Sequence, residues 1–114
     1  MDSAEYHKQC SSPASFRRKE LEDTYEALKV AQSEKAKIIA NALESSPIEK
    51  PRQHSGGQEN DYFNVAVPEL DAEAIIEVLG DLEAQSVSEE GHTTPLASHY
   101  ASLLDRWLRY VGVG

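Results

Sequence analysis

Three carboxylates have the spacing that comes closest to a chemical site. Glu73, Glu77 and Asp81 recur every four residues, so on a helix they form one row of side chains. Paired carboxylates can bind a divalent cation or transfer protons when they are buried. The surrounding pattern places this row on the polar side of an amphipathic helix, with no histidine beside it. We therefore interpret the row as a solvated acidic face.

A second set, Ser98, His99 and Asp105, has the residue types of a nucleophilic triad. Neighbouring residues on a helix point about 100° apart, so Ser98 and His99 are badly placed to share a hydrogen bond. The G-x-S-x-G pattern that presents a nucleophilic serine is also missing from the sequence. We expect no catalytic residues and no enzymatic activity.

Metal and cofactor signals are weak. His7 and Cys10 have a spacing that zinc ligands use, but structural zinc takes four ligands and Cys10 is the single cysteine. The glycine motifs that bind phosphates and dinucleotides are missing. We expect no metal site and no cofactor. The lone cysteine excludes an internal disulfide, and no apolar run suggests a signal peptide or a membrane span, so we expect a cytoplasmic protein that makes no membrane contact.

The net charge of −9 is divided unevenly along the chain. Residues 1–57 carry nine acidic and nine basic side chains, whereas residues 58–114 carry eleven acidic and two basic ones. Such an acidic half would repel a phosphate backbone, so we expect no direct binding of nucleic acid. A protein with a basic or apolar surface is the expected partner. The alternative interpretation is that the acidic face only keeps a small protein soluble.

The strongest predicted element is a helix within the stretch Thr94–Val113. Thr94 suits the N-cap position, Pro95 the first helical position and Gly112 the left-handed residue that ends a helix. Its large apolar side chains share an arc of about 160°. They are Leu96, Tyr100, Leu103, Leu104, Trp107, Leu108, Tyr110 and Val111.

A second amphipathic helix is predicted over residues 68–85, and it carries the acidic row. Gly80 lies beside this row, where it either permits close approach of another backbone or is a tolerated surface glycine. The turn Ser86–Thr93 is long enough for the two helices to lie antiparallel. We therefore expect a C-terminal helical hairpin.

The remaining segments are predicted from their periodicity. Residues 1–15 are polar without a period and are expected to form a disordered tail. Residues 16–44 have a narrow apolar stripe and are predicted to be one amphipathic helix, packed on its own chain or on another copy. Residues 45–60 contain prolines and adjacent glycines, and they are predicted to be a flexible linker.

Residues 61–67 form the only strand-like run, and they begin the final predicted unit, residues 61–114. Phe63, Val65 and Val67 alternate with smaller or polar residues. A lone strand is unstable, so this run is expected to be an extended arm on the helices, or to pair with a second subunit or a partner's sheet edge.

The chain as a whole is predicted to be all-α. We expect a small antiparallel hairpin or bundle of about three helices, completed by homodimerisation because the apolar face of Thr94–Val113 exceeds what its own chain is expected to cover. The expected partner-binding residues are Phe63, Val65, Ile75, Leu79, Leu82, Tyr100, Leu103, Leu104, Trp107 and Val111.

The missing chemistry and the one-sided charge favour a non-enzymatic regulatory protein that acts by protein–protein binding. An antiactivator or inhibitor that masks a transcription factor is one form of this hypothesis. The alternatives are a structural or adaptor subunit of a coiled-coil assembly and an acidic DNA mimic.

Overall fold

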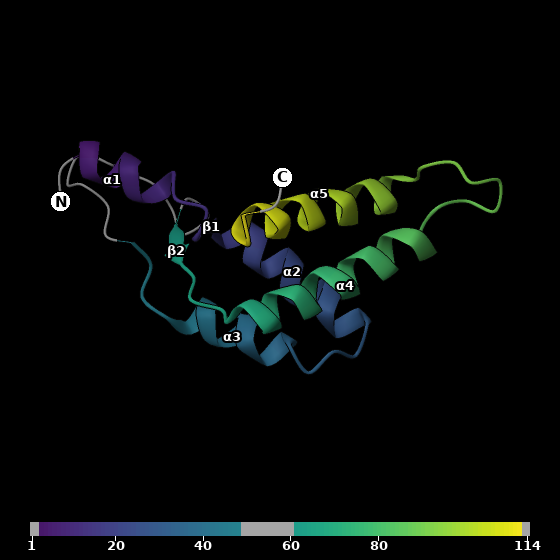
Figure 1. The fold of residues 1–114 in the computed structure, drawn as a ribbon, viewed down its shortest axis with the longest axis horizontal. Coiled ribbons are helices and arrows are strands. Elements are labelled where there is room, and N and C mark those ends of the chain that lie inside the picture. The colour runs from purple at the N-terminus through teal and green to yellow at the C-terminus, as the bar shows by residue number, and fades with distance from the viewer. Residues whose placement is uncertain (1–2, 49–60, 113–114) are drawn as a thin grey trace.

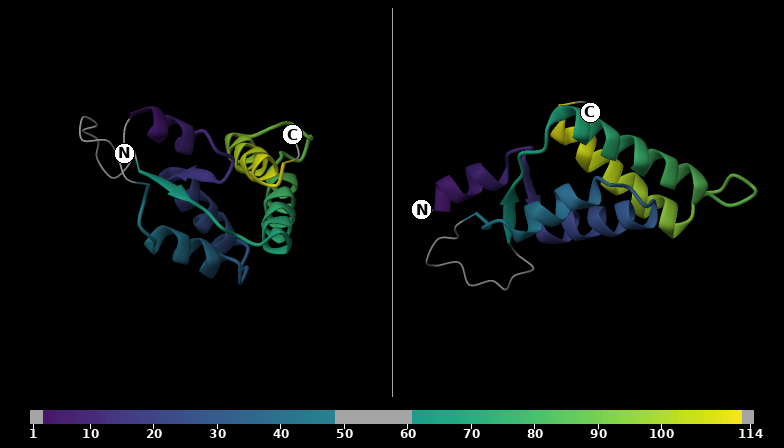
Figure 2. Two further views of the ribbon diagram at one scale, coloured as in Figure 1. Left: turned by 60° about the vertical axis from the view of Figure 1, so that its left-hand side comes forward. Right: turned by 90° about the horizontal axis from the view of Figure 1, so that it is seen from below.

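Two helical hairpins packed against each other make up most of the structure. The structure is a computed structural model that describes residues 3–48 and 61–112. Its elements, in chain order, are α1 (Ser3–Cys10), β1 (Ser15–Arg17), α2 (Arg18–Val30), α3 (Ala36–Glu44), β2 (Tyr62–Asn64), α4 (Glu69–Gln85) and α5 (Pro95–Tyr110). The helices α2 and α3 form one hairpin, α4 and α5 form the other, and α2 packs against both α4 and α5 (Figures 1 and 2). The predicted mainly helical fold is confirmed, with a two-stranded sheet added to it.

The predicted C-terminal hairpin is present. The Thr94 hydroxyl accepts a hydrogen bond from the Ala97 N–H at 3.0 Å and donates one to the Ser86 carbonyl, so it caps α5 and closes the turn at once. Gly112 follows α5 with a φ of +85°, the left-handed conformation expected of it. The loop between α4 and α5 projects from the end of the molecule opposite α1 (Figure 1).

The prediction of a single helix over residues 16–44 is wrong. The chain turns back at Gln32, so the segment forms the two helices α2 and α3. The N–H groups of Ser33 and Gln32 donate to the carbonyls of Leu28 and Lys29, which is the Schellman pattern that ends a helix. Gln32 takes the left-handed position, with a φ of +56°. Glycine is the usual residue at this position. Because the chain has glutamine there, the sequence gives no signal that α2 ends.

The sequence predicted a disordered tail over residues 1–15, but the structure places α1 and the start of β1 there. Tyr6 is 5% exposed, and its ring packs edge-on against that of Tyr62, with 6.4 Å between the ring centroids. The contact that orders this helix therefore lies far along the chain, where local periodicity gives no sign of it.

The strand-like run at residues 61–67 pairs with a partner that the sequence did not indicate. Strand β2 pairs with β1 in antiparallel register, with Phe63 opposite Phe16. The predicted alternation is confirmed, since Phe63, Val65 and Val67 are buried while Asn64 is exposed. The Tyr110 hydroxyl accepts from the Val67 N–H and donates to the Val67 carbonyl, both at 2.9 Å, so α5 holds the arm in place.

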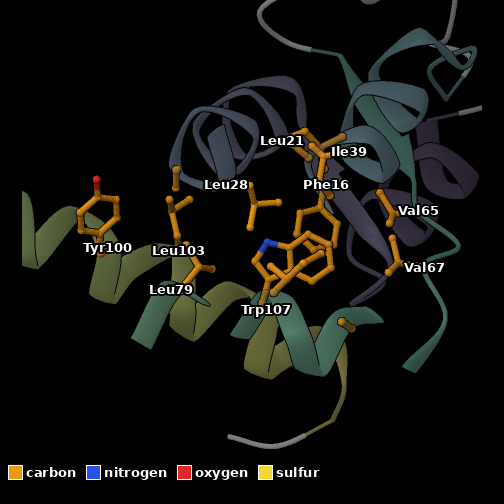
Figure 3. Close-up of a cluster of buried hydrophobic side chains, with 14 of the residues drawn as sticks. Phe16, Leu21, Leu28, Ile39, Val65, Val67, Leu79, Tyr100, Leu103 and Trp107 are labelled. Atoms are coloured by element: carbon orange, nitrogen blue, oxygen red, sulfur yellow. The ribbon is translucent and has the colours of Figure 1, made fainter. Parts of the chain in front are cut away.

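The core forms where α5 meets β1 and α2. Trp107 is fully buried, its ring centroid lies 4.6 Å from that of Phe16, and its Nε1–H donates to the Thr24 hydroxyl at 3.0 Å. Figure 3 shows Tyr100, Leu103 and Trp107 along α5, facing residues of the first hairpin. The centre of the apolar face of α5, made of Tyr100, Leu103 and Trp107, is therefore covered within one chain.

This arrangement changes the expected bundle. The described residues contain five helices rather than about three, and they close a core within a single chain. The homodimer was expected because an apolar face was thought to be uncovered. The homodimer stays a prediction, but the uncovered apolar face no longer supports it. Most of the predicted linker, residues 49–60, lies outside the described residues.

Trp107→Ala is expected to lower the free energy of unfolding by about 3–5 kcal/mol, because it empties a fully buried site and removes the donor to Thr24. Urea denaturation followed by circular dichroism measures this. Leu96→Ala is the matched control on the same helix, since Leu96 is 53% exposed, and it should change stability by less than about 0.5 kcal/mol. Similar small losses in both variants would contradict the assignment of Trp107 to the core.

The docking of α1 against the rest of the fold should weaken at alkaline pH. Burial, followed by a hydrogen bond with Cys10, raises the pKa of Tyr6 from 10.0 to about 12. A raised pKa means that the folded state favours the neutral phenol, so the stabilisation is complete below pH 10 and is lost as pH rises through 12. We expect the amide resonances of α1 to shift in this window, and Tyr6→Phe to abolish the shift. Titration of Tyr6 near pH 10 would contradict this account.

Candidate protein-binding surface

The structure places most of the predicted partner-binding residues inside the fold. Eight of the ten are buried: Phe63, Val65, Ile75, Leu79, Leu82, Tyr100, Leu103 and Trp107. The other two, Leu104 and Val111, are half-buried and pack against the same core. The eight buried side chains therefore hold the hairpins together and do not form an exposed surface in this structure.

The acidic row on α4 is exposed, as the sequence predicted. Glu73, Glu77 and Asp81 all face solvent, and no cation of the described residues lies within salt-bridge distance of them. Asp71, nearer the start of α4, differs because Lys35 of the other hairpin binds it at 2.7 Å. The outer side of α4 therefore keeps its negative charge uncompensated.

Next to this row, α4 and α5 enclose a groove of about 370 Å³ near their connecting loop. Its lining is made mostly of small side chains from both helices: Gly80, Glu83, Ala84 and Val87 from α4 and its end, and Thr93, Ala97, Ser98 and Ala101 from α5 and its start. A Cβ atom built on Gly80 would meet nothing within 4 Å. The space above Gly80 is therefore open.

The groove has an apolar floor and an acidic rim. By helical period, Ile76 lies one turn before Gly80 on α4, and Leu104 lies one turn after Ala101 on α5. Both are half-buried apolar residues that pack against the core, so the helical period puts them beside the groove, toward the middle of the hairpin. The acidic row flanks the α4 side of this floor, and Glu83 lines the groove itself. An apolar strip bordered by carboxylates is thus open to solvent.

This groove was missed by the sequence reasoning, although part of its signal was present. Gly80 and Ala84 are four residues apart on α4, and Ala97 and Ala101 are four apart on α5. Small residues at that spacing on two antiparallel helices leave a shallow channel between them. Only the register of the hairpin shows that the two pairs face the same channel.

The residue sets that suggested chemistry do not assemble. Ser98, His99 and Asp105 are exposed, and no hydrogen bond among the described residues joins their side chains. Burial raises the pKa of the Cys10 thiol, which makes the reactive thiolate scarcer. Within residues 3–48 and 61–112, no group of three or more potential ligands is placed to hold a metal ion.

A different groove, of about 430 Å³, lies in the α2–α3 hairpin. Its lining combines Tyr25, Ala36 and Ala40 with the charged side chains of Lys29, Glu34 and Lys37. Charges of both signs therefore surround it. The groove between α4 and α5 differs from it, because Glu83 is the one charged residue in the lining of that groove.

Comparison with known proteins gave no relative. No protein-family model matches this chain, and neither do curated proteins or solved structures. In the part of the chain that the structure describes, no helix has both the length and the apolarity to cross a membrane. The surface of the α4–α5 hairpin is therefore the basis for a functional proposal.

Proposed function

We propose that this protein is a non-enzymatic regulator that acts by binding another protein through the outer face of the α4–α5 hairpin. An inhibitor or antiactivator that masks a surface of its target, such as a transcription factor, is the form that we favour. The observation that carries the proposal is the open apolar groove beside a row of uncompensated carboxylates. We call this combination the acidic groove face, made of the groove lining together with Glu73, Glu77 and Asp81.

The charge distribution supports a partner with a basic surface. Residues 61–105 contain ten Asp or Glu and no Lys or Arg. Two of these carboxylates are neutralised by the first hairpin, since Arg18 binds Asp61 at 3.0 Å and Lys35 binds Asp71. Most of the others lie along α4 and the loop that follows it. A field of one sign speeds encounter with an oppositely charged surface and discriminates against partners of like charge.

The groove can supply the binding affinity that charge alone does not. Exposed ion pairs contribute little to affinity, whereas an apolar floor can bury the anchoring side chains of a partner. Val87 is 41% exposed at the groove and would lose that exposure on binding. Charge would therefore guide the encounter, and burial in the groove would hold the complex together.

A DNA mimic is the second candidate, and one observation favours it. The three carboxylates of the acidic row are exposed on one line of α4, with a rise of about 6 Å between successive members. Such a line could occupy the phosphate-binding surface of a DNA-binding protein. In that case DNA should compete for the target, and changes inside the groove should leave binding unaffected.

The proposal is tested by charge reversal. A variant with Glu73→Lys, Glu77→Lys and Asp81→Lys should lose its protein partner, because it inverts the charge of the acidic groove face. Affinity capture from the native cell, followed by mass spectrometry, identifies the partner. Titration calorimetry with the purified partner then gives the Kd of parent and variant. For the parent, affinity should fall as salt rises from about 50 to 200 mM.

The matched control reverses three exposed carboxylates of the other hairpin, Glu22, Glu26 and Glu34. It changes the net charge by the same amount and should keep the parent's Kd within about twofold, a difference below 0.5 kcal/mol. Equal weakening in both variants would show that net charge matters and the face does not. Full binding by the first variant would refute the proposal.

A further inference from the structure

We infer that the occupant of the acidic groove face is a basic amphipathic α-helix of the partner protein, lying along the channel between α4 and α5. The inference rests on the proposed function and names the kind of segment that the face would bind. It follows from the shape of the groove, from the residues on its floor and from the sign of its rim.

The shape favours a helix. Two antiparallel helices leave a channel along their length, and a third helix can lie in it at an axial separation of roughly 8–10 Å when the facing side chains are small. Gly80, Ala84, Ala97 and Ala101 are the residues that a helix would meet near the loop. Gly80 has no neighbour within 4 Å of its missing Cβ, so a large side chain of the partner has room above it.

The floor sets the apolar pattern of the partner. Val87 at one end of the channel and the half-buried Ile76 and Leu104 toward its middle are apolar. They suit anchors repeated at three or four residues, which is how an amphipathic helix fills a groove. An extended peptide lacks this match, since its side chains alternate between two faces.

The rim sets the charge of the partner. Glu77 and Asp81 are exposed beside the floor and Glu83 lines it, so the polar flanks of the bound helix should carry Lys or Arg. A second copy of this chain is the poorer occupant. If two copies paired through this face, symmetry would set one acidic row against the other.

The test uses the full chain, labelled with 15N, and two synthetic peptides of about 18 residues, which span ~27 Å as helices. One peptide has leucines at i, i+3, i+4 and i+7 on a lysine-rich background. The other has the same composition with the stripe scrambled. The first should become helical on binding and shift the amide resonances of Gly80, Ala84, Ala97 and Ala101. Identical shifts with both peptides, or none at the groove, would overturn the inference.

Gly80→Leu provides a variant that blocks the groove without harming the fold. The new side chain enters open space and replaces a helical glycine, so the melting temperature should equal or exceed the parent's. Binding of the amphipathic peptide and of the captured partner should weaken by at least about tenfold. Asn41→Leu, at an exposed position of α3 in the other hairpin, is the control and should leave both affinities unchanged.

The outcomes separate this inference from the proposed function. Loss of the partner on charge reversal, together with full partner binding by Gly80→Leu, would leave the function standing and overturn the helix in the groove. Light scattering tests whether a second copy of the chain occupies the groove instead. A dimeric parent and a monomeric Gly80→Leu variant would identify a second copy of the chain in the groove, which would also overturn the inference.

Discussion

The contact of Phe16 with two successive residues of α5 is the interaction on which the rest of the structure depends. The Phe16 ring lies 4.6 Å from the ring of Trp107 and 3.8 Å from the guanidinium carbon of Arg106. Arg106 also donates to the carbonyls of Pro13 and Ser15 and pairs with Glu20 at 3.3 Å. One turn of α5 thus joins the N-terminal segment, β1 and α2. Burial lowers the pKa of Arg106, and the nearby Glu20 carboxylate opposes that effect.

This contact decides which surfaces remain for binding. Because β1 and α2 cover Trp107 and its neighbours, the strongest apolar face of the sequence is used inside the chain. The acidic row and the groove of small residues lie away from this contact, and the residues that line the groove all come from α4, α5 and the loop between them. The fold therefore separates its two roles. One side of the hairpin stabilises the molecule, and the other is free to meet a partner.

The sequence predicted those parts of the fold whose signals are local. Thr94, Pro95 and Gly112 mark the ends of α5 with their own conformational preferences, and both ends were placed correctly. The turn at Gln32 was missed because a Schellman motif needs only a left-handed residue, and glutamine gives no warning of one. The helix α1 and the strand β1 were missed because they depend on contacts with residues more than 40 positions away.

The candidate surface was predictable only in part, for the same physical reason. Exposure of Glu73, Glu77 and Asp81 follows from helical period, which any amphipathic pattern reveals. Whether the apolar face of α5 is an interface or a core depends on what covers it, and the cover comes from Phe16 and α2. The periodicity of the sequence could not identify this cover, because it assigned Phe16 to the start of one long helix and not to a strand. The surplus of apolar surface that suggested a dimer was therefore overestimated.

Fluorescence quenching of Trp107 measures whether the apolar face of α5 is covered by its own chain, because Trp107 is the only tryptophan of the chain. Acrylamide quenching would be measured along a dilution series whose oligomeric state is followed by light scattering. We expect the indole to be strongly shielded at every concentration, including those at which the protein is a monomer. Quenching that rises as an oligomer dissociates would contradict this expectation, because Trp107 would then be covered by a second chain.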